Sequence, residues 1–187
     1  IRKILFLSFG DNYYARYDRF GKQEKYYEII FETAKQIQSY DKYTLSYRSH
    51  SSNREYNEYI FNFFGVKNLM LYDEKDTFEN IIYNYDLVVC NITNCFYQSI
   101  SAGVPVIFVE PDMITDSINM PFSGKNGEEV IRATSSSELV DVILRNTENP
   151  QELNDYIENF HNTYYDEYFG HLDGNSAKRI YNQLLPD

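Results

Sequence analysis

At 187 residues, with 43% apolar and 24% charged residues, the chain is long enough for one soluble domain with its own core and marginal for two. A net charge of −11 excludes the general nucleic-acid binders, which need a basic surface. The longest apolar run, residues 104–109, is far too short to cross a bilayer, and the run at 4–7 is too short for the core of a signal peptide.

The charge is distributed unevenly along the chain. Residues 1–50 carry nine Lys or Arg and six Asp or Glu, whereas the remainder carries eight basic and 22 acidic residues. An anionic ligand is therefore expected to bind near the first 50 residues. The chain begins with Ile1 rather than Met, as expected of a piece of a longer protein.

The first elements expected along the chain alternate between strand and helix. Short apolar runs predict buried strands at 3–8, 43–47 and 66–71. Between them, apolar residues recur at helical spacing over 23–39 and again over 56–64, where Gly65 ends the helix.

The second half of the chain continues the alternation. It predicts a short helix at 78–85, a strand at 86–90, a helix at 94–102 closed by Gly103, strands at 104–109 and 129–133, and helices at 137–145, 153–164 and 175–185. Continuous apolar strands between helices predict an α/β fold, with a six-stranded parallel sheet and helices on both faces. We expect a sheet domain over 1–149 and a helical tail over 150–187 that packs on it.

A ligand of such a sheet is expected beyond the carboxyl ends of the strands, near the switch in strand order. The loop after the second strand carries Arg48 and His50 among three serines. A permanent cation, an imidazole and hydroxyls suit a phosphate group. The alternative is a solvated turn that ends in a helix cap.

A second candidate is the turn from the strand at 86–90 into the following helix. Thr93 and Asn94 are good helix caps, and the free N–H groups of a helix start would accept a diphosphate without a glycine-rich loop. An ordinary cap is again the alternative. Gln98, one turn later, could direct its amide at a ligand. Glu110 and Asp112 follow the next strand and could orient a sugar hydroxyl, although acidic loop residues are usually only solvated.

Several catalytic classes lack their motifs in this sequence. It contains no G-x-S-x-G, no G-x-x-x-x-G-K-[ST] and no G-x-G-x-x-G. The metal-binding patterns H-E-x-x-H and D-x-D are also missing. We therefore expect neither a metal nor a cofactor.

Three segments together resemble the donor-binding half of GT-B glycosyltransferases. Their residues are 86–89 (D-L-V-V), 91–94 (N-I-T-N) and 97–107 (Y-Q-S-I-S-A-G-V-P-V-I). The family pattern is D-L-V-x-S-S/T followed by E-A-x-x-x-G-x-P-V-I. The tail 169–180 (F-G-H-L-D-G-N-S-A-K-R-I) is similar to the D-G-x-A-S-x-R-I ending of CDP-glycerol glycerophosphotransferases and related capsule, O-antigen and teichoic-acid transferases. The opening 6–10 (F-L-S-F-G) is similar to a surface-carbohydrate transferase group of the same clan.

This resemblance implies the Rossmann-like, C-terminal half of a GT-B enzyme. Such enzymes transfer a group from a nucleotide-activated sugar or polyol phosphate without a bound metal. Arg48 and His50 would meet the donor phosphates, with His50 as the candidate catalytic residue, and Gln98 stands where many members have a Glu that binds ribose hydroxyls. The donor-binding residues implied are Ser8, Gly10, Arg48, His50, Thr93, Asn94, Gln98 and Asp112.

The resemblance also implies the setting of the full-length enzyme. It would make bacterial surface polysaccharide in the cytoplasm, where it could lie at the inner face of the membrane. The full-length enzyme could then associate peripherally with that membrane. Its N-terminal acceptor domain would be missing from this chain, so the isolated domain is expected to turn over little substrate.

Two other functions stay open at this point. A nucleotide-sugar epimerase, such as a UDP-sugar 2-epimerase, has the same fold, although the tail at 169–180 argues against it. A non-catalytic nucleotide-binding domain would keep the fold without the chemistry, and Gln98 in place of Glu is the feature that indicates it.

Overall fold

A computed structural model of the chain describes residues 2–8, 19–49, 63, 65, 70–71, 76–91, 94–110, 131–149, 151–152, 154–155, 158 and 174–184. Six parallel strands form one sheet in the order β3-β2-β1-β4-β5-β6. The strands are β1 (Arg2–Leu7), β2 (Tyr43–Arg48), β3 (Met70–Leu71), β4 (Leu87–Cys90), β5 (Val106–Val109) and β6 (Arg132–Ala133). The predicted parallel α/β sheet is confirmed, and its two outer strands are only two residues long.

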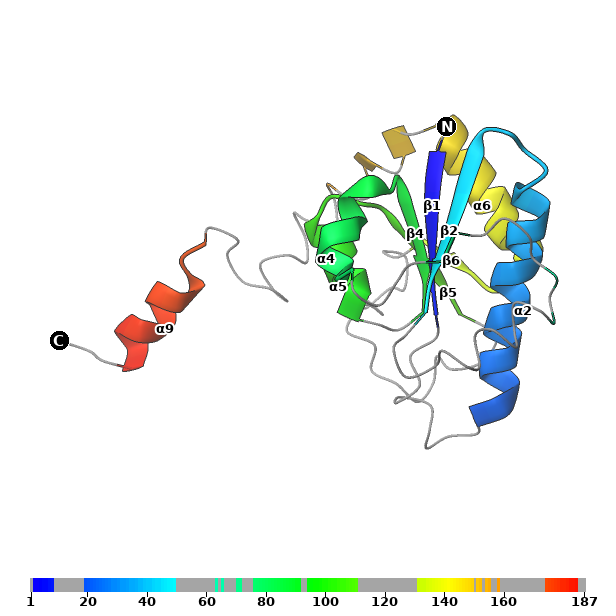
Figure 1. The fold of residues 1–187 in the computed structure, drawn as a ribbon. Coiled ribbons are helices and arrows are strands. Elements are labelled where there is room, and N and C mark those ends of the chain that lie inside the picture. Colours follow the sequence, from blue (N-terminus) through cyan, green and yellow to red (C-terminus); the bar gives the residue numbers. More distant parts are fainter. Residues whose placement is uncertain are drawn as a thin grey trace.

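All but the last of the described helices cover the two faces of this sheet (Figure 1). They are α2 (Arg19–Ile37), α4 (Phe78–Ile81), its 3-10 extension η2 (Ile82–Asn84), α5 (Asn94–Ser101), α6 (Ser136–Glu148) and α9 (Ser176–Leu184). Helices α2 and α6 lie on one face, and α4 and α5 lie on the other. The predicted helix at 56–64 and most of that at 153–164 fall outside the described residues.

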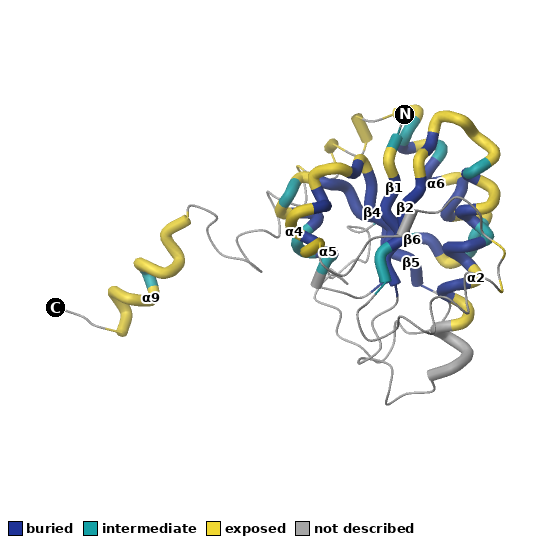
Figure 2. The backbone as a smooth tube through the Cα atoms, viewed as in Figure 1, coloured by how far each residue is buried: buried dark blue, intermediate teal, exposed yellow. Residues whose placement is uncertain are grey.

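The apolar pattern of β1 explains the two layers. Side chains alternate along a strand, so Ile4 and Phe6 join the core under α2 and α6, whereas Leu5 and Leu7 join the core under α4 and α5. All four are almost completely buried. Figure 2 shows the strands buried and the outer sides of the covering helices exposed. The central strand therefore carries no polar side chain between residues 4 and 7.

Local signals in the sequence set the ends of two helices. Gly103 has φ 72°, a left-handed conformation that favours glycine, and its N–H donates to the Ile100 carbonyl at 2.9 Å. This is the predicted close of α5. At the start of α6, the Ser135 hydroxyl accepts the Glu138 N–H at 3.2 Å, and the Glu138 carboxylate accepts the Thr134 N–H at 2.8 Å.

The strand order determines where a binding crevice can form. The chain runs outward from β1 to β2 and β3, and then returns to the other side of β1 with β4, β5 and β6. The switch therefore lies between β1 and β4. Ser8 and Asn91 follow the carboxyl ends of these two strands.

Helix α9 buries none of its residues and stands apart from the sheet domain in Figure 1. Ile180, Tyr181 and Leu184 are its exposed large apolar side chains. The boundary at residue 149 and the packing of the whole tail stay predictions.

Candidate functional site

The carboxyl edge of the sheet brings together two of the predicted site residues. The Ser8 N–H donates to the Arg48 carbonyl at 2.9 Å, which extends the pairing of β1 with β2 by one residue. Ser8 is buried, and its side chain makes a hydrogen bond with the hydroxyl of Tyr47. Ser8 therefore joins the two strand ends from within the core.

Arg48, the last residue of β2, holds a positive charge beside the crevice. Its guanidinium carbon lies 5.9 Å from the centre of the Phe78 ring. A cation over an aromatic face is attracted to it without being neutralised. Within the described part of the chain, Nη1 of Arg48 is buried and has no hydrogen-bond partner. Leaving a buried donor unsatisfied costs about 1–3 kcal/mol, and a phosphate oxygen would supply the missing acceptor.

Glu79, which sequence reasoning missed, follows Phe78 in α4. Its pKa is lowered, first by a hydrogen bond from its own backbone N–H and then by hydrogen bonds from Thr77 and Gln98 and by the charge of Arg48, against a partial loss of solvation. Because Glu79 is an exposed residue on a four-residue helix, no apolar spacing in the sequence marks it.

Gln98 donates its amide Nε2 to Oε1 of Glu79. Gln98 is half-buried on α5, and Glu79 lies on α4, so the hydrogen bond links the two helices of this face. One donor that the sequence assigned to a ligand is thus engaged with a carboxylate.

The turn after β4 is fastened to the neighbouring strand. Asn91 is buried, and its Nδ2 donates to the carbonyl of Val109 at the end of β5. Asn94 is the first residue of α5. Its side chain lies outside the described part, as do all of Gly10, His50, Thr93 and Asp112. Their predicted roles stay predictions.

Glu110 and Arg132 form an ion pair at the carboxyl ends of β5 and β6. Arg132 Nη1 lies 2.6 Å from Glu110 Oε2, and the side chains are 21% and 10% exposed, respectively. Glu110 is therefore paired rather than solvated, and its predicted contact with a sugar hydroxyl stays a prediction. The sequence separates the partners by 22 residues, so no local pattern marks the pair.

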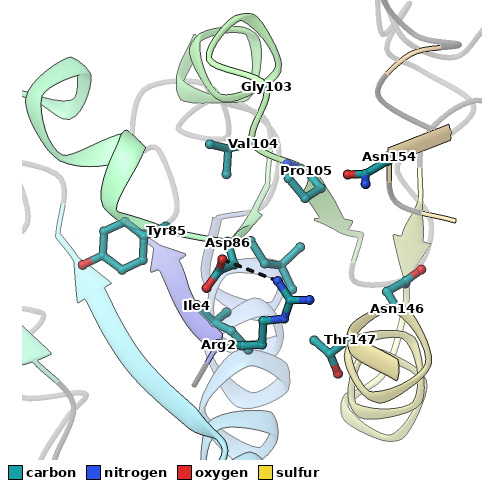
Figure 3. A pocket seen from close by; sticks show the side chains of 11 residues that line it. Arg2, Ile4, Tyr85, Asp86, Gly103, Val104, Pro105, Asn146, Thr147 and Asn154 are labelled. Atoms are coloured by element: carbon teal, nitrogen blue, oxygen red, sulfur yellow. Dashed lines mark ion pairs between the residues drawn. The ribbon is translucent and has the colours of Figure 1, made fainter. Parts of the chain in front are cut away.

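The opposite, amino edge of the sheet holds a cavity of about 220 Å³ (Figure 3). There the Asp86 carboxylate accepts the Lys3 N–H at 2.8 Å and lies 3.6 Å from Arg2 Nη1. The Asp86 N–H in turn donates to the Lys3 carbonyl at 2.9 Å. Asp86, which opens the D-L-V-V segment, thus fastens β4 to β1 on the side away from the crevice.

The described residues contain no group of three or more His, Cys, Asp or Glu side chains that could hold a metal ion. No helix among them is long and apolar enough to cross a membrane.

No protein-family model matches the chain, and no curated protein matches it in sequence. Solved structures do match its fold. UDP-GlcNAc 2-epimerase from Neisseria meningitidis bound to UDP-GlcNAc aligns with all of this chain and 44% of its own, with a TM-score of 0.63 and 15% identity. The wall teichoic acid polymerase TagF aligns with 98% of this chain and 42% of its own, with a TM-score of 0.56 and 13% identity.

A third match is ADP-heptose LPS heptosyltransferase II from E. coli. It aligns with 84% of this chain and 47% of its own, with a TM-score of 0.50 and 14% identity. The chain therefore spans less than half the length of each of these three structures. At such low identity the likeness establishes the fold alone, and this chain has the Rossmann-like fold of one half of a GT-B protein.

Proposed function

We propose that the chain is the nucleotide-sugar or nucleotide-polyol phosphate binding domain of a metal-independent glycosyltransferase that makes bacterial surface polysaccharide. The observation that carries the proposal is Arg48, whose buried Nη1 lacks an acceptor at the carboxyl edge of the sheet. Solved structures of this fold include a teichoic acid polymerase and a heptosyltransferase, which supports the transferase class. The acceptor domain would lie outside this chain, in a cytoplasmic enzyme at the inner face of the membrane.

The chemistry follows from the charge that develops on the departing phosphate. Arg48 donates to its non-bridging oxygens, and the N-terminus of α5 faces it with free N–H groups. Fixed donors of this kind stabilise a leaving nucleotide without a metal ion. His50, two residues beyond β2, is the residue proposed to stabilise or protonate the leaving group. Asn94, Thr93, Gly10 and Asp112 are proposed to line the same crevice.

An epimerase is the second candidate, because UDP-GlcNAc 2-epimerases are among the solved structures of this fold. Both classes bind a UDP-sugar but differ in what happens to it. An epimerase inverts a sugar centre without an acceptor, whereas a transferase consumes its donor only when an acceptor is present. Full-length enzyme incubated with UDP-sugar, with and without an acceptor glycan, separates the two.

Calorimetry on the 187-residue chain tests the binding site itself. We expect UDP and CDP to bind more tightly than CMP, and uridine to bind least, because the diphosphate makes the main contacts. EDTA should leave these affinities unchanged. Equal affinity for uridine and UDP, or binding only with a divalent ion, would contradict the proposal.

A further inference from the structure

We propose that the cavity at the amino edge of the sheet is a second binding site, which takes a neutral polyhydroxylated molecule such as one sugar or polyol unit. The cavity lies beside the amino ends of β1, β4 and β5 and the last turn of α6 (Figure 3). The proposed nucleotide site lies at the opposite, carboxyl edge, so the two proposals do not depend on each other.

A buried amide oxygen on the cavity wall lacks a hydrogen-bond donor. Asn146, in the last turn of α6, lines the cavity and is only 1% exposed. Its Nδ2 donates to the Val142 carbonyl at 2.7 Å, but no described group donates to its Oδ1. Leaving a buried acceptor unpaired costs free energy, and such groups are usually satisfied by a protein or solvent partner. A hydroxyl group in the cavity would supply the missing donor.

Arg2 and Asp86 place a donor and an acceptor on the same cavity. Arg2 Nη1 lies 3.6 Å from Asp86 Oδ1, which is too far for a direct hydrogen bond, whereas Asp86 Oδ2 already accepts the Lys3 N–H. A polar contact of this length leaves room for a bridging group. A hydroxyl suits that position, because it can accept from the guanidinium and donate to the carboxylate at once. Asn154, an exposed residue on the same cavity, adds a further amide.

The charges on the wall favour a ligand without net charge. Arg2 and Asp86 offset each other, so the cavity has no excess charge for a ligand to neutralise. An inorganic anion offers acceptors alone, would leave Asn146 Oδ1 unpaired and would lie beside the Asp86 carboxylate. An ammonium ion offers donors alone and would lie beside the Arg2 guanidinium. A neutral polyol offers donors and acceptors together.

The size and the apolar wall of the cavity fit one such unit. Ile4, Leu87 and Val104 are buried apolar residues that line it, and they suit the C–H face of a sugar ring. The volume of about 220 Å³ is smaller than the roughly 300–1,000 Å³ of pockets that hold drug-sized ligands. A single sugar or polyol unit therefore matches the space, either free or as one unit of a glycan chain.

The first test is a nuclear magnetic resonance titration of the ¹⁵N-labelled chain. We expect glucose to shift the side-chain amide signals of Asn146 and Asn154 with a Kd of about 1–10 mM, the range of a weakly held small ligand. Maltotriose separates the two sources, because tighter binding of maltotriose indicates a glycan chain and tighter binding of glucose indicates a free sugar. Inorganic phosphate and methylammonium should not shift these signals.

The second test removes the polar wall without removing the fold. Asn146→Leu should abolish glucose binding and leave the thermal midpoint unchanged or higher, because it deletes an unpaired buried oxygen, and the Val142 carbonyl keeps its helical backbone donor. Asn154→Ala changes an exposed residue and should weaken glucose binding roughly three- to ten-fold. Asn80→Ala, an exposed asparagine on α4, is the matched control and should bind like the parent.

The proposal is wrong if neither sugar shifts the Asn146 and Asn154 signals, or if phosphate or methylammonium shifts them and the sugars do not. It is also wrong if Asn154→Ala binds glucose like the parent. A parallel titration with UDP keeps this site apart from the nucleotide site. Shifts near Arg48 with UDP and none with a sugar would remove this inference alone, whereas sugar shifts without UDP shifts would remove the proposed function alone.

Discussion

Arg2 and Arg48 are the same kind of residue at opposite edges of the sheet, with different surroundings. Arg2 begins β1 and lies 3.6 Å from the Asp86 carboxylate, which also holds the Lys3 N–H. Arg48 ends β2 and rests on an aromatic ring, with a buried N–H that no described group accepts. The charge at the amino edge lies beside the carboxylate that joins β1 to β4, whereas the charge at the carboxyl edge is the one proposed to bind the nucleotide.

Position at the carboxyl edge does not by itself create a binding site. Arg132 also lies there, but Glu110 neutralises it at 2.6 Å. What distinguishes Arg48 is that no ion pair among the described residues includes it. The three arginines therefore differ in whether a carboxylate pairs with them, and substitutions can test whether the unpaired one meets a ligand.

The largest expected effect is at Glu110, a structural group on the edge proposed for binding. Glu110→Ala should lower the free energy of unfolding by about 2–3 kcal/mol, slightly below the usual loss for a fully buried pair, because Arg132 is left without its partner. Urea unfolding measures this, with Glu152→Ala, an exposed residue, as the control. UDP affinity should stay unchanged in the folded protein. A loss of affinity with normal stability would instead make Glu110 a ligand contact.

The next effect is on binding and contrasts the two arginines directly. Arg48→Ala should weaken UDP binding roughly 10- to 100-fold, because a charge-assisted hydrogen bond contributes about 1.5–3 kcal/mol. Arg2→Ala is the matched control and should leave the affinity unchanged. Calorimetry gives both values, and circular dichroism verifies folding. Equal losses from the two substitutions would mean a diffuse charge effect rather than a site at Arg48.

Asp86 should show the reverse pattern, with loss of stability and no loss of binding. Asp86→Ala removes the acceptor of the Lys3 N–H and the partner of Arg2. We expect a loss of about 1 kcal/mol in unfolding free energy, since the carboxylate is partly exposed to solvent. Asp141→Ala, an exposed residue on α6, should have no effect. Weaker UDP binding by folded Asp86→Ala would show that the amino edge also affects the nucleotide site.

The smallest effect concerns acid stability at Glu79. Its pKa lies below the ordinary value of 4.5, so ionised Glu79 stabilises the fold above that value. This contribution is lost as the pH falls through the lowered pKa. The stability difference between parent and Glu79→Gln should therefore be constant above about pH 5 and should shrink in more acidic solution. Thermal unfolding of both proteins from about pH 7 to about pH 3 measures it, and a difference that grows with acid would contradict the assignment.

Much of the fold could be predicted from the sequence because its signals are local. Apolar runs indicated the six strands, helical spacing indicated α2, α5 and α6, and Gly103 closed α5 as expected. A parallel sheet then places all carboxyl ends at one edge, so Arg48 could be assigned to the crevice side before the structure was known. These inferences need only neighbouring residues and the direction of the chain.

The pairing of polar side chains was decided by tertiary structure. Asp86 meets Lys3 across 83 residues, Gln98 meets Glu79 across 19, and Arg132 meets Glu110 across 22. Each contact depends on the strand register and on which helices lie side by side. Neither the register nor the helix packing produces a periodic pattern in the sequence. An arginine, glutamine or glutamate on a surface segment has many candidate partners of similar energy. The packing of apolar side chains against the sheet selects one of them, so Arg2 and Arg132 each lie beside a carboxylate, whereas no ion pair among the described residues includes Arg48.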